Sequence, residues 1–130
     1  MENIVRYAIA VFFFLHGFAH VVGFAGAWKL AKDVPYKTTL LSGRLDVGDT
    51  GIRVMGIIWL LTALMFALTA VALAVQLSWW RVAAISVVSF SLVLCAVNLP
   101  EAKIGLVINI LLLVFLIASI PLDLFNPPVK

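Results

Sequence analysis

The sequence has 130 residues, of which 65% are apolar and only 12% are charged, and its formal net charge is +3 at pH 7. The charged share is about half that of an ordinary soluble domain, which excludes a typical soluble protein. The basic residues flank apolar runs, so we expect the lipid bilayer as the partner and no nucleic acid. The single cysteine, Cys95, excludes an intrachain disulfide and a C-x-x-C redox pair.

Charged residues cluster between four long apolar runs. A helix needs about 20 apolar residues to cross a bilayer, and its backbone must satisfy its own hydrogen bonds there. The sequence therefore predicts an all-α protein, an integral membrane bundle of four transmembrane helices with up-down-up-down topology, in a single domain over residues 1–130. We expect helices over residues 4–28, 50–77, 79–99 and 102–122, with a long polar loop at 29–49.

The first predicted helix contains the stretch FFFLHGFAHVVGF, residues 12–24. His16 and His20 are four residues apart, so their rings share one helical face. Polar groups inside a membrane are costly and usually face the bundle interior or a water-filled cavity. We therefore expect both rings to face inward, with three apolar side chains on the outer face: Phe14, Phe18 and Val22.

Basic residues are unevenly divided between the two ends of the predicted bundle. The end with the long loop carries six of the nine Lys and Arg residues, and the other end carries three. Cytoplasmic segments carry the excess of positive charge in most membrane proteins. The loop is therefore predicted to lie in the cytoplasm and both termini outside it. The six are Lys29, Lys32, Lys37, Arg44, Arg53 and Lys103.

Further polar residues gather in the membrane half that contains His20. Three lie at or after the third helix, and two lead into the second helix. We expect a polar pocket there, with His20 bridging inward to His16 and outward to Asn98, Glu101 or Asn109. The alternative is that these residues cap helix ends and satisfy one another, as buried polar groups generally do. The candidate ligand-binding residues are His16, His20, Asn98, Glu101, Asn109, Arg53 and Asp49.

Known histidine motifs fit the H-G-F-A-H stretch only in part. Its spacing is that of a zinc metalloprotease helix, but Gly17 stands where the glutamate base would be. His16 and His20 could ligate one Zn or Cu ion, with Glu101 or a loop aspartate completing the shell. Haem held by two histidines needs ligands on opposite sides of the iron, so it would require a homodimer.

The segment GIRVMGIIWLLTALMFAL, residues 51–68, adds a resemblance to a known family. Together with a glycine-containing first span, a long first loop and short later hairpins, it resembles the DoxX-like group of bacterial membrane proteins. The resemblance implies an accessory membrane subunit associated with quinone-linked redox enzymes, or a small module of unknown role. It transfers no catalytic residue to this chain.

The leading functional hypothesis is a binding or accessory module in the bacterial cytoplasmic (inner) membrane. Its ligand would be a metal ion, a quinone or a lipid headgroup. The alternatives are a redox or electron-transfer subunit with metal or haem on His16 and His20, or a small transporter that works as a dimer. The sequence leaves open whether the chain is an enzyme, and we expect either a homo-oligomer or a subunit of a larger membrane complex.

Overall fold

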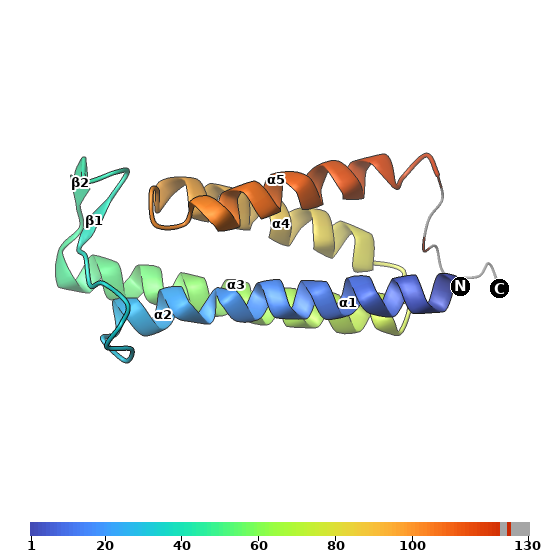
Figure 1. The fold of residues 1–130 in the computed structure, drawn as a ribbon, viewed down its shortest axis with the longest axis horizontal. Helices are drawn as coiled ribbons and strands as arrows, with labels where there is room; N and C mark the ends of the chain where they lie inside the picture. The colour runs from blue at the N-terminus through green and yellow to red at the C-terminus, as the bar shows by residue number, and fades with distance from the viewer. Residues whose placement is uncertain (123–124, 126–130) are drawn as a thin grey trace.

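The computed structural model describes residues 1–122 and Phe125, and their fold is all-α apart from one short β-hairpin. Successive long helices run antiparallel, and the hairpin lies at the end opposite the N-terminus (Figure 1). The helices are α1 (Glu2–Ala19), α2 (Val21–Ala27), α3 (Gly48–Ala74), α4 (Trp80–Val97) and α5 (Lys103–Ala118), and the strands are β1 (Thr39–Leu40) and β2 (Leu45–Asp46).

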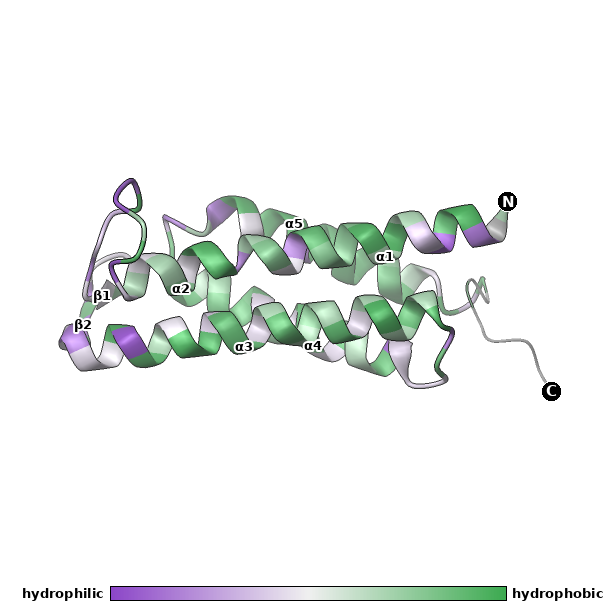
Figure 2. Ribbon diagram, turned by 90° about the horizontal axis from the view of Figure 1, so that it is seen from below, coloured by the Kyte–Doolittle hydropathy of each residue, from purple (hydrophilic) through white to green (hydrophobic). Residues whose placement is uncertain are grey.

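Three helical segments are long and apolar enough to cross a membrane: Asn3–Ala27, Gly48–Ala74 and Trp80–Val97. Their hydrophobic residues continue along most of the length of the molecule (Figure 2). Helix α5 has 16 residues, which corresponds to about 24 Å of helix. The prediction of an all-α protein is confirmed, and these three segments have the length and composition that a membrane span needs. Helix α5 is shorter than the predicted 102–122.

Local hydrogen bonding explains where the helices end. After α3, Gln76 adopts a positive φ of 56°, and the Leu77 amide donates to the Ala72 carbonyl at 2.9 Å. This is a Schellman motif, which closes a helix by satisfying its last carbonyls. Helix α5 ends at Ala118, shortly before Pro121. The proline ring disfavours the helical conformation of the residue before it, so the helix does not continue to this point.

Small residues allow α1 and α2 to pack closely on α3. A Cβ added to Gly17 would overlap the Phe66 side chain, and one added to Gly56 would lie 2.7 Å from the Ala27 Cβ. Such close approaches suit membrane helices, where no hydrophobic effect drives the helices together. Gly56 and Ala63 are both buried, as expected for a small-residue face of α3.

The helices form two layers, with α1, α2 and α3 in one and α4 and α5 in the other (Figure 1). Apolar side chains from both layers fill a common core, including Phe13, Phe66, Val88 and Leu116. Helix α1 packs extensively on α3, α3 on α4, and α4 on α5, whereas α1 and α5 pack on each other only sparsely. A groove therefore runs between α1 and α5.

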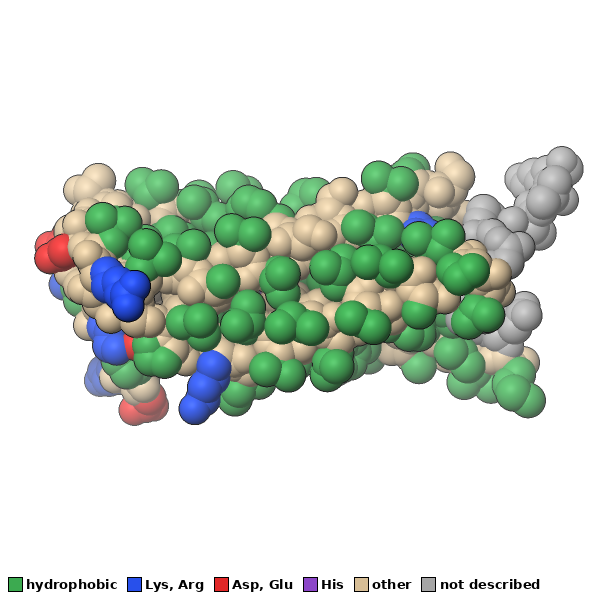
Figure 3. Space-filling view, turned by 90° about the horizontal axis from the view of Figure 1, so that it is seen from above, with side chains coloured by type: hydrophobic (Ala, Val, Ile, Leu, Met, Phe, Trp, Pro, Cys, Tyr) green, Lys and Arg blue, Asp and Glu red, His purple; other side chains and the backbone are tan. Residues whose placement is uncertain are grey.

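The long connection between α2 and α3 is fixed to the end of α4. The Leu41 amide donates to the Val97 carbonyl at 2.8 Å, and the Ser42 amide donates to the Leu99 carbonyl at 3.2 Å. The last carbonyls of a helix lack partners within the helix, so these two loop amides supply them. Most of the visible charged side chains gather at this end of the molecule (Figure 3).

Candidate functional site

The first helical segment is interrupted at His20. The His20 amide donates to the Gly17 carbonyl at 3.0 Å, which is a 3₁₀ hydrogen bond. In a regular α-helix this amide would instead donate to the His16 carbonyl. That carbonyl is bound by the His20 ring, whose Nδ1 lies 2.9 Å from it. The imidazole thus replaces a backbone donor and ends α1.

Both imidazoles join a buried hydrogen-bonded cluster that connects three helices. His16 Nε2 lies 3.0 Å from the Asn109 side-chain oxygen on α5. The Asn109 amide nitrogen donates to the Ser91 hydroxyl on α4 at 2.8 Å, and this hydroxyl lies 2.7 Å from His20 Nε2. All four side chains are buried, and Ser91 and Asn109 are fully inaccessible to solvent.

The surroundings of the two histidines are aromatic rather than charged. The Phe66 ring lies 5.0 Å from the His16 ring and 5.1 Å from the His20 ring, and the Trp59 ring lies 5.2 Å from the His20 ring, measured between centroids. Among the described residues, neither histidine takes part in an ion pair. An uncompensated charge buried at this depth is costly, so both imidazoles are neutral.

The directions of the hydrogen bonds follow from the one partner that can only accept. The His16 carbonyl accepts, so His20 Nδ1 carries a hydrogen and His20 Nε2 carries a lone pair. The Ser91 hydroxyl therefore donates to His20 and accepts from the Asn109 amide. This leaves the Asn109 oxygen to accept from His16 Nε2. The cluster is a closed circuit in which the two histidines hold opposite tautomers.

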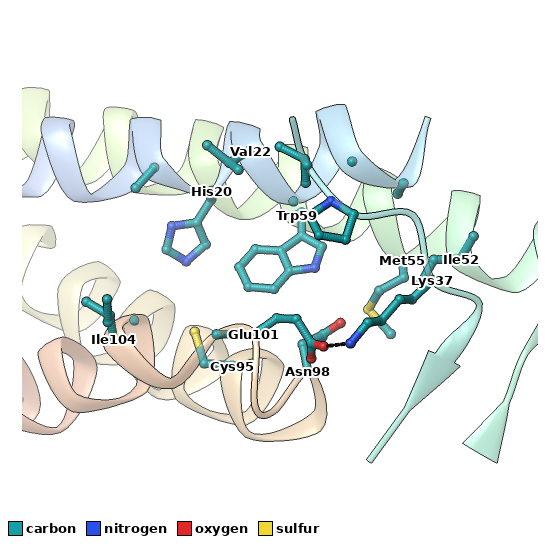
Figure 4. Close-up of a pocket in the computed structure, with 18 of the residues that line it drawn as sticks. His20, Val22, Lys37, Ile52, Met55, Trp59, Cys95, Asn98, Glu101 and Ile104 are labelled. Carbon is teal, nitrogen blue, oxygen red and sulfur yellow. Dashed lines mark hydrogen bonds and ion pairs between the residues drawn. The ribbon is translucent and has the colours of Figure 1, made fainter. Parts of the chain in front are cut away.

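A cavity of about 680 Å³ lies beside this circuit, between the first helical segment and the α4–α5 hairpin (Figure 4). His16 and His20 form part of its wall, and much of the remaining wall is apolar, including Trp59 and Ile108. Val22 and Ile104, which also line it, are 53% and 70% exposed. The cavity therefore reaches the apolar outer surface between α2 and α5.

The loop end of the cavity is polar. Lys37 from the loop forms an ion pair with Glu101 in the α4–α5 connection, and both side chains line the cavity (Figure 4). The Lys37 ammonium holds the pKa of the Glu101 carboxyl below its ordinary value. This contact lies outside the membrane-spanning helices, and it ties the loop to the far side of the cavity mouth.

The structure places five of the seven predicted site residues at the circuit or the cavity. His16 and His20 belong to both, Asn109 to the circuit, and Asn98 and Glu101 to the cavity wall. The sequence suggested that His20 would contact Asn98, Glu101 or Asn109. Its outward hydrogen bond goes to Ser91 instead, and its inward bond goes to the His16 carbonyl.

The other two predicted residues, Asp49 and Arg53, lie at the base of the loop and do not line the cavity. Asp49 accepts a hydrogen bond from the Tyr36 hydroxyl, which raises the pKa of Tyr36. The Arg53 guanidinium lies 5.6 Å from the centre of the Trp28 ring. Both residues therefore stabilise the loop base by local contacts.

Ser91 is the functional residue that the sequence analysis missed. It joins His20 to Asn109, so the circuit cannot close without it. The available signal was the spacing of Ser91, Cys95 and Asn98 along α4, at steps of four and three residues. This spacing places three small or polar side chains on one helical face, opposite the histidines.

The donor set does not fit the predicted metal or haem ligation. Three of the four imidazole nitrogens already have hydrogen-bond partners. Within residues 1–122 and Phe125, no group of three or more His, Cys, Asp or Glu side chains could hold a metal ion. Ligation by both histidines would therefore require the circuit to open and further ligands to come from elsewhere.

No protein-family model matches the sequence, and neither a curated protein nor a solved structure matches it. The resemblance to the DoxX-like group thus stays a prediction. The contacts, burial and shape of the site are the basis on which a function is assigned.

Proposed function

We propose that the protein is an integral membrane protein that binds an amphipathic small molecule from the bilayer. The observation that carries this proposal is the cavity of about 680 Å³, which reaches the apolar outer surface and contacts His16 and His20 at depth. Its volume lies within the range of about 300–1,000 Å³ that is usual for small-molecule sites. The mixture of apolar wall and few polar groups suits a ligand with both characters.

The hydrogen-bonded circuit alone does not account for this cavity. If the polar residues served only to satisfy one another, tight packing around them would be expected, since protein interiors are packed as densely as organic crystals. Instead, a space of about 680 Å³ remains beside His20, even though Gly23 and Gly26 in its wall pack closely on Trp59 and Val34. A space of this size next to satisfied polar groups supports a binding role.

A membrane location with four spans is part of the proposal. Helix α5 packs antiparallel on α4, and after Lys103 it contains no charged residue. One of its faces is exposed and apolar, as lipid contact requires: Ile104, Val107, Leu111 and Val114. The DoxX-like resemblance favours the bacterial cytoplasmic membrane and an accessory role in a larger complex.

The orientation can be tested by cysteine labelling. Because the loop end carries most of the basic residues, it should face the cytoplasm. In a Cys95→Ser background, Lys32→Cys and Ser78→Cys place single thiols at exposed positions on opposite ends. An impermeant maleimide added to intact cells should label the variant at position 78 and spare the variant at position 32. The reverse pattern would show the opposite orientation.

Binding can be tested with the native thiol. Cys95 is the single cysteine, is 1% exposed and lines the cavity. Its alkylation by N-ethylmaleimide in mild detergent should slow when 4-nonylphenol, an amphipathic probe, fills the cavity. The control is Leu15→Cys in a Cys95→Ser background, because Leu15 is 59% exposed and lies outside the cavity wall. Protection of Cys95 without protection of the control supports the proposal, and equal rates with and without probe contradict it.

A further inference from the structure

The circuit leaves one ring nitrogen without a partner. His16 Nε2 carries the hydrogen that it donates to Asn109, so Nδ1 of the neutral ring carries a lone pair. No described residue donates a hydrogen bond to this atom, although His16 is only 7% exposed. This atom is not among the fully buried side-chain atoms without a partner, so it is accessible, and His16 lines the cavity. In apolar surroundings no bulk water satisfies such an acceptor, so it calls for a partner.

Among the described neighbours of the His16 ring, no donor is free to reach this nitrogen. The His20 ring meets the His16 ring edge-on at 5.1 Å, but its only N–H is committed to the His16 carbonyl. The Phe12 and Phe66 rings, which pack at 6.3 Å and 5.0 Å from the His16 ring, have no polar hydrogen. Because His16 lines the cavity, the remaining source of a donor is the molecule that fills it.

From this geometry we infer that the cavity selects ligands that carry a hydroxyl group, and that His16 Nδ1 accepts its hydrogen bond. The inference rests on the proposed function and specifies its ligand class, an amphipathic alcohol or phenol. A carbonyl or ether oxygen in the same place would face a lone pair and gain nothing. A cationic amine would need a compensating charge, and the polar groups that line this depth are neutral.

A second cavity gives the apolar part of such a ligand a place. It measures about 790 Å³ and lies between α1 and α5, towards the N-terminus. Its wall is almost wholly apolar, with Ile4 and Phe12 on α1 and Leu112 and Phe115 on α5. Phe12 also stacks on the His16 ring, so this cavity begins next to the proposed hydroxyl site. A lipid chain attached to the hydroxyl-bearing group therefore has an apolar path along the groove.

The experiment compares two probes that differ only in the donor. The probes are 4-nonylphenol and its methyl ether, 4-nonylanisole, each measured by protection of Cys95 from alkylation. One neutral hydrogen bond corresponds to roughly a fivefold difference in affinity. The preference for the phenol in the native protein is compared with that in His16→Leu, because the ratio of the two cancels the different partitioning of the probes into detergent.

His16→Leu removes the acceptor, and His16→Gln is the matched control, because its amide nitrogen can still donate to Asn109 and its amide oxygen can still accept from the phenol. We expect the preference for the phenol to fall about fivefold in His16→Leu, while the ether binds as before, and to persist in His16→Gln. An unchanged preference in His16→Leu would refute the role of His16. If neither probe protects the native protein, the proposed function itself fails, which separates the two outcomes.

The tautomers of His16 and His20 can be measured in the native protein, so this test does not depend on the folding of a variant. The chain contains two histidines, so labelling with ¹⁵N-histidine gives four ring resonances. We expect one histidine protonated at Nδ1 and the other at Nε2, and the unprotonated Nδ1 resonance should shift when 4-nonylphenol is added but not when the ether is added. Two histidines of the same tautomer, or a free Nδ1 that does not respond to the phenol, would overturn the inference.

Discussion

Asn109→Leu is the substitution that tests the circuit most directly. Asn109 is fully buried, and its side chain links the His16 ring on α1 to the Ser91 hydroxyl on α4. Leucine branches at Cγ as asparagine does and is the bulkier of the two, so the substitution removes hydrogen bonds without creating a cavity. It leaves the His16 Nε2–H without an acceptor and deprives Ser91 of the hydrogen bond that it accepts.

The expected loss follows from the two bonds at 3.0 Å and 2.8 Å. Hydrogen bonds between membrane helices contribute about 0.6 kcal/mol on average and about 1.7 kcal/mol at most. Two of them give about 1.2 kcal/mol, with an upper value of about 3.4 kcal/mol. We therefore expect a loss of about 1–3 kcal/mol in the free energy of unfolding.

The measurement is reversible unfolding in mixed micelles of dodecyl maltoside and SDS, followed by helical circular dichroism. Thr69→Val is the matched control, because Thr69 is 1% exposed and its hydroxyl bonds only to the Met65 carbonyl of its own helix. A double-mutant cycle of Asn109→Leu with Ser91→Ala should give a coupling of about 0.5–3 kcal/mol. Additive losses, together with a loss at Asn109 no larger than at Thr69, would show that the circuit contributes no stability of its own.

Two further predictions concern helix packing and the cavity mouth. Gly17→Ala should destabilise the protein by about 1–3 kcal/mol, because the added methyl group overlaps the Phe66 side chain; a gain in stability by thermal unfolding would contradict the packing described. Glu101→Gln should cost up to about 1 kcal/mol at pH 7, since its ion pair with Lys37 is half exposed. The pKa of Glu101 is lowered in the folded state, so the ion pair stabilises above the unfolded pKa and its contribution is lost as pH falls through the folded pKa. The native protein and Glu101→Gln should therefore become equally stable in acid, and a constant difference would refute the assignment.

The sequence predicts the helices well because charged residues lie near their ends. Helices α1, α3, α4 and α5 each begin within two residues of the predicted start, whereas the break at His20 that separates α2 was not predicted. The inward direction of His16 and His20 is confirmed by their burial, and Phe14 and Phe18 lie on the outer face as predicted, whereas Val22 lines the cavity. Helical periodicity contains this information, because one face must be polar and the other apolar.

The partners of the histidines could not be predicted in the same way. Asn109 was expected near His20 but bonds to His16, because the depth of a residue in α5 depends on how that helix slides against α4. Ser91 resembles any other small residue of a membrane helix until α1 is placed opposite it. The cavity depends on side chains from four helical segments and the loop, so no local pattern indicates it.

The circuit also explains how the helices can stay associated around a cavity. The backbones of α1 and α5 approach each other at few points, although side chains from both helices reach the common core. The bond from His16 to Asn109 crosses the groove between them, and the bond from His20 to Ser91 fixes the same helix to α4. In lipid an unmade hydrogen bond has no water to replace it, so directional bonds can hold helices apart at a set distance where close packing would close the space. The polar cluster and the cavity are thus two consequences of one arrangement, and a substitution that breaks the first should change access to the second.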